Sequence, residues 1–259
     1  MPALFKDFQP RFFYHLYSHK IFFWFFVAFF ALQLFFWHKT ENIKPHFDLL
    51  PPAPSKYIIS AASLGDKEFL FRAMATRLQN SGDVFAGFVA LKKYDYSRIY
   101  QWLKSLDELN EKSNFAPSLA AYIYSQTQNY GDSRYIVDYL EEHSVKDIDK
   151  NWWWLFQAIY IARDRMHDNQ RALELAYKLS ENNAVNAPLW TKEMPAFIHE
   201  DMGDGCMAFK VIEKILHESE SGIRKVKPEE LNFMRDFIQG RLRKLQEGKF
   251  DPKKCTKNL

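Results

Sequence analysis

The chain has 259 residues and a formal net charge of +3, with 47% hydrophobic and 26% charged residues, a composition that excludes disordered and collagen-like chains. Aromatic residues are unusually frequent at 17%, with 24 phenylalanines, whereas glycine occurs only nine times. Because glycine supplies the positive φ of phosphate-cradling loops and tight hairpin turns, its scarcity argues against nucleotide-binding and all-β folds.

The first expected element is a transmembrane helix at residues 21–37, after an amino-terminal tail of residues 1–20. Its sequence contains Gln33 as the only polar side chain and, at 1.5 Å per residue, covers roughly 25 Å. Trp24 and Trp37 are amphipathic aromatics of the kind that prefer the headgroup level. A buried core helix is less favoured because no face is polar, and a cleaved signal peptide because no small-residue cleavage site follows.

Residues 38–56 are expected to be a linker, because the segment LLPPAPS at 49–55 contains three prolines that favour an extended spacer. Three lysines or arginines lie on each side of the expected span, so the flanking charges do not decide its orientation. We favour a cytoplasmic amino terminus, with the larger domain on the other side of the membrane.

Residues 57–246 are predicted to be all-α, because apolar residues recur at intervals of three and four with turn signals between the runs. The repeating unit is a helix, a short turn and a helix. Flanking helices at about 66–79 and 228–246 are expected to cap the two ends. Pro228, followed by Glu229 and Glu230, suits a helix start by its fixed φ and by the negative charge near the amino end.

Small residues recur at Gly87, Ala121, Ala158 and Ala196, with spacings of 34, 37 and 38. This pattern resembles the tetratricopeptide repeat over roughly residues 80–218, which implies a solenoid of about four helical hairpins. The sequence departs from the family in lacking its first tryptophan in three of four units. Units two and three also carry about two extra residues between their helices. Residues 94–129 are similar to membrane-anchored bacterial repeat proteins, which implies the bacterial inner membrane. With the orientation favoured above, the domain would lie in the periplasm.

The resemblance implies a concave groove lined by the first helix of each unit. The corresponding positions in this chain are Phe88, Tyr122, Ser125, Trp152, Ile159, Trp190, Phe197 and Glu200. This surface would be aromatic and apolar, with acid at one end. A peptide or helix of a partner protein, with apolar anchors and some positive charge, is the expected ligand.

Catalytic, metal and cofactor motifs are not found in the sequence, so we expect neither an enzyme nor a cofactor. His199, Asp201 and Asp204 crowd one turn but lack the pattern of a calcium loop. The run 152–154 of three tryptophans is expected to pack mainly in the core, because consecutive helix positions point about 100° apart. Cys206 and Cys255 are either free thiols or one bridge.

Charge is unevenly divided along the chain: residues 57–223 hold 18 Lys or Arg and 24 Asp or Glu, whereas residues 224–259 hold 11 and five. The basic tail, residues 247–259, is either solvated or in contact with anionic lipid. Nucleic acid is not an expected partner, because the acidic domain would repel phosphate.

These features predict a single-pass membrane protein that acts as a scaffold or assembly factor for a protein partner. The alternative is a structural accessory subunit of a larger membrane complex, packed through the transmembrane helix.

Overall fold

The structure is a computed structural model, and it describes residues 11–40, 49–84, 87–181, 186–221 and 227–247. It divides into two compact units, Met1–Asp48 and Leu49–Leu259. Both are helical, as the sequence predicts. Among the described residues, strands are limited to a two-residue antiparallel pair, β1 (Asp83–Val84) and β2 (Gly87–Phe88).

The first unit contains one helix, α1 (Arg11–Thr40), which includes the segment 21–37 predicted from the sequence. No glycine or proline interrupts these 30 residues, so nothing in the backbone breaks the helix. Within α1, Lys20–Lys39 is long and apolar enough to cross a membrane, and none of the residues in its most apolar stretch is buried. Both Trp24 and Trp37 are exposed along it. A membrane anchor and a signal sequence share these properties.

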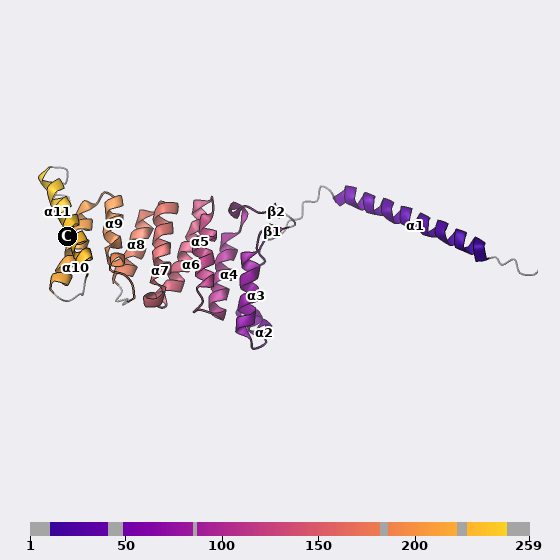
Figure 1. Ribbon diagram of the computed structural model, residues 1–259, viewed down its shortest axis with the longest axis horizontal. Helices are drawn as coiled ribbons and strands as arrows, with labels where there is room; N and C mark the ends of the chain where they lie inside the picture. Colours follow the sequence, from indigo (N-terminus) through magenta and orange to yellow (C-terminus); the bar gives the residue numbers. More distant parts are fainter. Residues whose placement is uncertain (1–10, 41–48, 85–86, 182–185, 222–226, 248–259) are drawn as a thin grey trace, which may run out of the picture. The chain divides into compact units, whose positions relative to one another are not determined.

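The second unit is a row of helices that follow one another in space in chain order (Figure 1). From α3 to α11 each helix packs against the next, and α4 also packs on α6 and α5 on α7. The helices are α2 (Lys56–Ala62), α3 (Lys67–Gln79), α4 (Tyr96–Leu109), α5 (Phe115–Tyr122), α6 (Ser133–Val145), α7 (Ile148–Tyr160), α8 (Asn169–Glu181), α9 (Trp190–Asp201), α10 (Gly205–Glu220) and α11 (Pro228–Gln246). Short 3₁₀ turns lie at Leu91–Lys93, Tyr124–Gln126 and Tyr130–Asp132.

Helices are present at both positions where the sequence predicts flanking helices, as α3 and α11, although α3 packs on α4 and so belongs to the first helix pair. The carboxylate of Asp66 accepts a hydrogen bond of 2.9 Å from the backbone N–H of Phe69, which satisfies one free donor at the start of α3. Asp95, Asp147 and Asp204 cap α4, α7 and α10 in the same way. Local sequence signals therefore fix many of the helix starts.

The position of the first hairpin differs from the sequence prediction. Ala121, Ala158 and Ala196 are buried on α5, α7 and α9, but Gly87 lies on β2 and not on a helix. The first helix of the first hairpin is instead α3, and a long connection leads from it to α4. This connection turns at Gly82, whose φ is +107° and whose Cβ, if present, would lie 1.8 Å from the Tyr94 hydroxyl. Only glycine fits this backbone without displacing Tyr94.

The extra residues expected between the two helices of one hairpin also have a structural counterpart. The α7 helix continues as a π-helical turn at Ile161–Arg165 before α8 begins at Asn169. A π turn accommodates additional residues in a helix without changing how its earlier turns pack. The stacking of α7 on α8 is therefore preserved.

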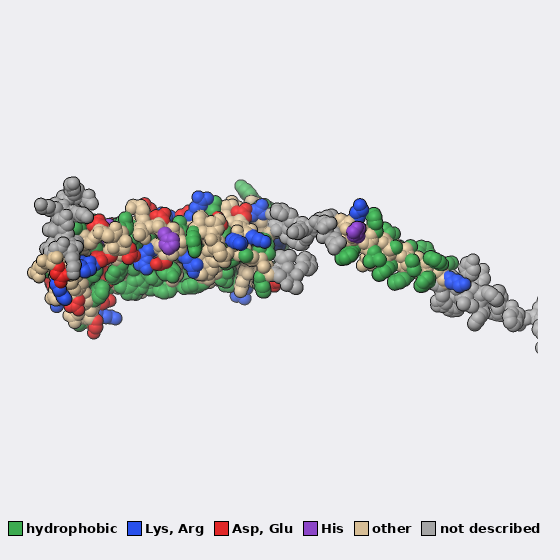
Figure 2. All heavy atoms as spheres, turned by 90° about the horizontal axis from the view of Figure 1, so that it is seen from above, with side chains coloured by type: hydrophobic (Ala, Val, Ile, Leu, Met, Phe, Trp, Pro, Cys, Tyr) green, Lys and Arg blue, Asp and Glu red, His purple; other side chains and the backbone are tan. Residues whose placement is uncertain are grey.

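The second unit has one large hydrophobic core, which runs from Leu50 to Ile198, and a smaller one shared by α9, α10 and α11. Hydrophobic side chains also gather at the surface, in a band along one long side of this unit (Figure 2). Cys206 is buried on α10 and is disulfide-bonded. Cys255 and the basic tail from residue 248 onward lie outside the described residues.

Candidate interaction surface

The helix α7 has a buried face and an aromatic surface face. Trp153, Phe156 and Tyr160 follow one another at spacings of three and four residues and so lie on the same side of the helix. Trp153 and Tyr160 are 38% and 45% exposed, which is high for rings of this size in a folded domain. On the other side, Trp154 is buried and its indole N–H donates to Asn114 Oδ1 at 3.0 Å. The tryptophan run is thus divided between the core and the surface.

Aromatic rings from α5 and α9 extend this surface on both sides of α7. The Trp153 indole N–H donates to the Tyr122 hydroxyl of α5 at 2.8 Å. On the α9 side, Trp190 meets Phe156 edge to face with ring centroids 4.9 Å apart, and Trp152 at 5.8 Å. Such edge-to-face pairs hold aromatic rings in defined orientations. We call Tyr122, Trp152, Trp153, Phe156, Tyr160 and Trp190 the aromatic face.

The structure places only some of the eight predicted groove residues on this face. Tyr122, Trp152 and Trp190 belong to it. Ser125 is buried, with its hydroxyl donating to the Ala121 carbonyl at 2.5 Å, and Ile159 is 0% exposed. Neither can contact a partner in this structure. The cause is rotational register, because on α7 the exposed positions run through Trp153 and Tyr160 and not through Ile159.

The other predicted groove residues lie elsewhere. Phe88 is 92% exposed on β2, outside the helical part of the stack. Phe197 is half-buried on α9 and packs against Phe233 of α11, with ring centroids 6.2 Å apart. Trp153, Phe156 and Tyr160 are not among the eight expected residues, although their helical spacing is visible in the sequence.

The two glutamates expected at the acidic end of the groove, Glu193 and Glu200, lie near side chains of α11. Glu200 forms an ion pair with Arg241 of that helix. Glu193, about two turns earlier on α9, is buried, and this burial together with the nearby Glu230 raises its pKa to about 7. Neither carboxylate is arranged to receive a positively charged ligand.

The polar turn between α9 and α10 has a structural role. Asp204 caps α10 by accepting from the Met207 N–H at 3.1 Å, and the Tyr177 hydroxyl lies 2.9 Å from His199 Nε2. Burial lowers the pKa of His199. Across the described residues, no group of three His, Cys, Asp or Glu side chains could hold a metal ion.

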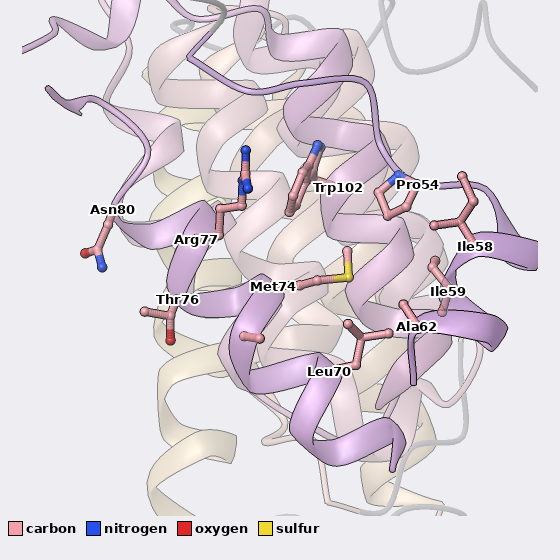
Figure 3. A pocket seen from close by; sticks show the side chains of 11 residues that line it. Pro54, Ile58, Ile59, Ala62, Leu70, Met74, Thr76, Arg77, Asn80 and Trp102 are labelled. Atoms are coloured by element: carbon pink, nitrogen blue, oxygen red, sulfur yellow. The ribbon is translucent and has the colours of Figure 1, made fainter. Parts of the chain in front are cut away.

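A pocket lies at the amino-terminal end of the stack, between α2, α3 and Trp102 of α4 (Figure 3). This open pocket has a volume of about 630 Å³ and is lined mainly by apolar side chains, among them Ile58, Leu70 and Met74. The Trp102 indole N–H donates to the Pro51 carbonyl at 2.8 Å, and the Arg77 guanidinium lies 6.0 Å from the centre of the Trp102 ring. The hydrogen bond between Trp102 and Pro51 holds the segment before α2 against α4.

No protein-family model, curated protein or solved structure matches this chain.

Proposed function

We propose that this protein is a membrane-anchored scaffold or assembly factor whose helical stack binds a peptide or helix of another protein on the aromatic face. The main support for this proposal is the row of partly exposed aromatic rings on α5, α7 and α9, which pack against one another. Large exposed apolar patches are uncommon on proteins that act alone. Tryptophan and tyrosine are also the side chains that most often dominate binding energy at interfaces.

The geometry favours binding at low entropic cost. The rings of the aromatic face are held by edge-to-face contacts and by the hydrogen bond between Trp153 and Tyr122. A partner would therefore meet side chains that are already ordered, so less conformational entropy is lost on association. The resemblance to tetratricopeptide repeats supports the same surface, because α5, α7 and α9 are the first helices of successive hairpins.

We propose that α1 anchors the protein in a membrane, with the helical unit in the bacterial periplasm. The apolar segment Lys20–Lys39 has the length of a span. The disulfide-bonded state of Cys206 supports an oxidising compartment, since disulfides persist there and are rare in the cytosol. An anchor confines the search for a membrane-bound partner to two dimensions and so raises its effective concentration.

The partner surface is proposed to be apolar, without the requirement for positive charge that the sequence suggested. Glu200 is paired with Arg241 of α11, and Glu193 is buried in the core. Neither carboxylate is therefore available to a positively charged partner. Apolar or aromatic anchors on the partner would fit between the exposed rings.

The alternative role, as an accessory subunit of a membrane complex, rests on Gln33. This exposed amide is the only polar side chain between residues 21 and 37 and could hydrogen-bond to a neighbouring span. A fixed-stoichiometry complex in mild detergent that dissociates with Gln33→Leu, but not with changes to the aromatic face, would favour this role.

Site-specific photocrosslinking tests the proposed surface. p-Benzoylphenylalanine is introduced at Tyr160 on α7 and, as a matched control, at the exposed Glu174 on α8, in the full-length protein in its native membrane. We expect a discrete adduct from position 160, none from position 174, and loss of the adduct when Trp153→Asp is added. Equal adducts from both positions, or no adduct from position 160, would contradict the proposal.

A further inference from the structure

The amino-terminal end of the helical unit exposes large apolar side chains that the fold does not use. Tyr57 and Ile58 on α2 are exposed, as is Phe69 on α3, and Leu64 in the turn between them is 93% exposed. The strand pair β1–β2, with the exposed Phe88, lies at the same end of the stack (Figure 1). In repeat solenoids the terminal helices normally present a polar outer face, because solubility requires it.

Leu64 is the least expected of these residues. Its φ is +46°, in the left-handed region where glycine and asparagine are favoured and where a leucine costs roughly 1 kcal/mol. Its side chain is almost fully in solvent, so packing within the unit does not offset this cost. Neither backbone conformation nor burial accounts for a leucine here, which points to a role outside the folded unit.

The charge of this end differs from that of the rest of the stack. Residues 49–94 hold six Lys or Arg and three Asp or Glu, whereas residues 95–223 hold 13 and 21. Lys67, Lys92 and Lys93 are exposed among them. An anionic surface would therefore attract this end and repel the acidic remainder.

The chain length keeps this end close to the membrane in which α1 is proposed to lie. Only residues 41–55 separate the end of α1 at Thr40 from the start of α2 at Lys56. Fully extended, these residues span at most about 50 Å. A bilayer surface is thus always within reach of α2 and α3.

We propose that Tyr57, Ile58, Leu64 and Phe69 form a lipid-contact face that inserts into the headgroup region of an anionic bilayer, with Lys67, Lys92 and Lys93 pairing with lipid phosphates. This inference rests on the anchoring role proposed for α1. Apolar side chains flanked by lysines are the pattern of surfaces that lie in a membrane interface. The exposed apolar area is then removed from water by the lipid, as burial would otherwise do.

Depth-dependent quenching in nanodiscs tests this face. An environment-sensitive fluorescent amino acid replaces Leu64 in the full-length chain or, as a control at the other end of the stack, the exposed Ser221. The protein is reconstituted at one copy per nanodisc containing phosphatidylglycerol and a quencher lipid labelled near the headgroup. We expect a blue-shifted, strongly quenched emission at position 64 and an unquenched emission at position 221. Lys67→Gln should lower the ratio of quenched to unquenched protein about fivefold, the factor that corresponds to ~1 kcal/mol per lysine.

The outcomes separate this inference from the anchor. If the chain enters nanodiscs but position 64 is as solvent-exposed as position 221, the lipid-contact face is wrong and the anchor stands. If the chain does not enter nanodiscs, both proposals fail. Shielding of position 64 that appears only at two or more copies per nanodisc would show a contact between protein molecules and would overturn the lipid assignment.

Discussion

Asp107 is a buried carboxylate on α4 that is held by two side chains of α6. The Tyr139 hydroxyl donates to Oδ1 at 2.9 Å, and His143 Nδ1 lies 2.8 Å from Oδ2. Because a carboxylate only accepts hydrogen bonds, Nδ1 is the nitrogen of His143 that carries the proton. Burial, with the adjacent Asp107, raises the pKa of Tyr139 well above its usual range, so the phenol stays protonated as the donor. This network joins two helices that are not neighbours in the chain.

Replacing Asp107→Ala should therefore destabilise the helical unit by about 3 kcal/mol, because two buried donors lose their shared acceptor. Urea denaturation of the full-length protein in detergent measures the change. Glu108→Ala is the matched control, since Glu108 forms only an exposed pair with Lys56, and it should change stability by less than about 1 kcal/mol. Equal losses of stability in the two variants would show that the hydrogen bonds of Asp107 do not stabilise the helical unit.

Glu193, near Glu230 of α11, should make the stability of the folded protein depend on pH. Its folded-state pKa is raised to about 7, chiefly by burial, from an ordinary value of 4.5. A carboxyl with a raised folded pKa favours the folded state most below pH 4.5, and this stability is lost as the pH rises through 7. Over that window the loss is on the order of 3 kcal/mol.

Glu193→Gln should abolish this contribution. The denaturation midpoint is measured at pH 5 and at pH 8 for the unchanged protein and for Glu193→Gln. We expect the midpoint to change less with pH in the variant. At pH 8 the variant should be more stable than the unchanged protein. Glu213→Gln, at an exposed position on α10, serves as the control. An identical pH profile for the protein and its Glu193→Gln variant would show that Glu193 does not titrate in this range.

At the scale of single helices, Ala158 is the small residue that permits close packing of α7. It is 0% exposed and lies opposite the aromatic face on the same helix. Ala158→Leu adds volume to a packed core and should cost about 1–3 kcal/mol. Gln157→Leu, at a partly exposed neighbour, should cost much less. Thermal unfolding followed by circular dichroism compares them, and a neutral Ala158→Leu would mean that the helices are not closely packed here.

The features of this fold that could be predicted from the sequence are those that local interactions decide. Pro228 marks a helix start through its own backbone, and the flanking helix that begins there was predicted from it; Asp66 caps α3 in a similarly local way. The first hairpin was misplaced because Gly87 fits the spacing of the small residues on helices but lies on β2, in the connection between α3 and α4. On α7 the expected groove position Ile159 is buried, because spacing from Ala158 does not determine which helices cover it.

For the whole molecule, the proposed topology makes a direct prediction for sealed inner-membrane vesicles with the periplasmic side enclosed. Trypsin added outside should leave the helical unit of Leu49–Leu259 intact until detergent opens the vesicles. The disulfide bond of Cys206 is consistent with that enclosed, oxidising side. Digestion of the unit in intact vesicles would place it in the cytoplasm and reverse the orientation.

An apolar helix, proposed to hold the protein in a membrane, precedes a stack of helical hairpins that presents aromatic rings. The most direct test is quantitative isolation of the full-length protein in mild detergent, comparing it with Trp153→Asp combined with Tyr160→Asp. We expect the unchanged protein to retain a defined partner, and the double variant to lose most of it while keeping its helical circular dichroism spectrum. Unchanged recovery of the same partner by a folded double variant would contradict the aromatic face as the binding surface.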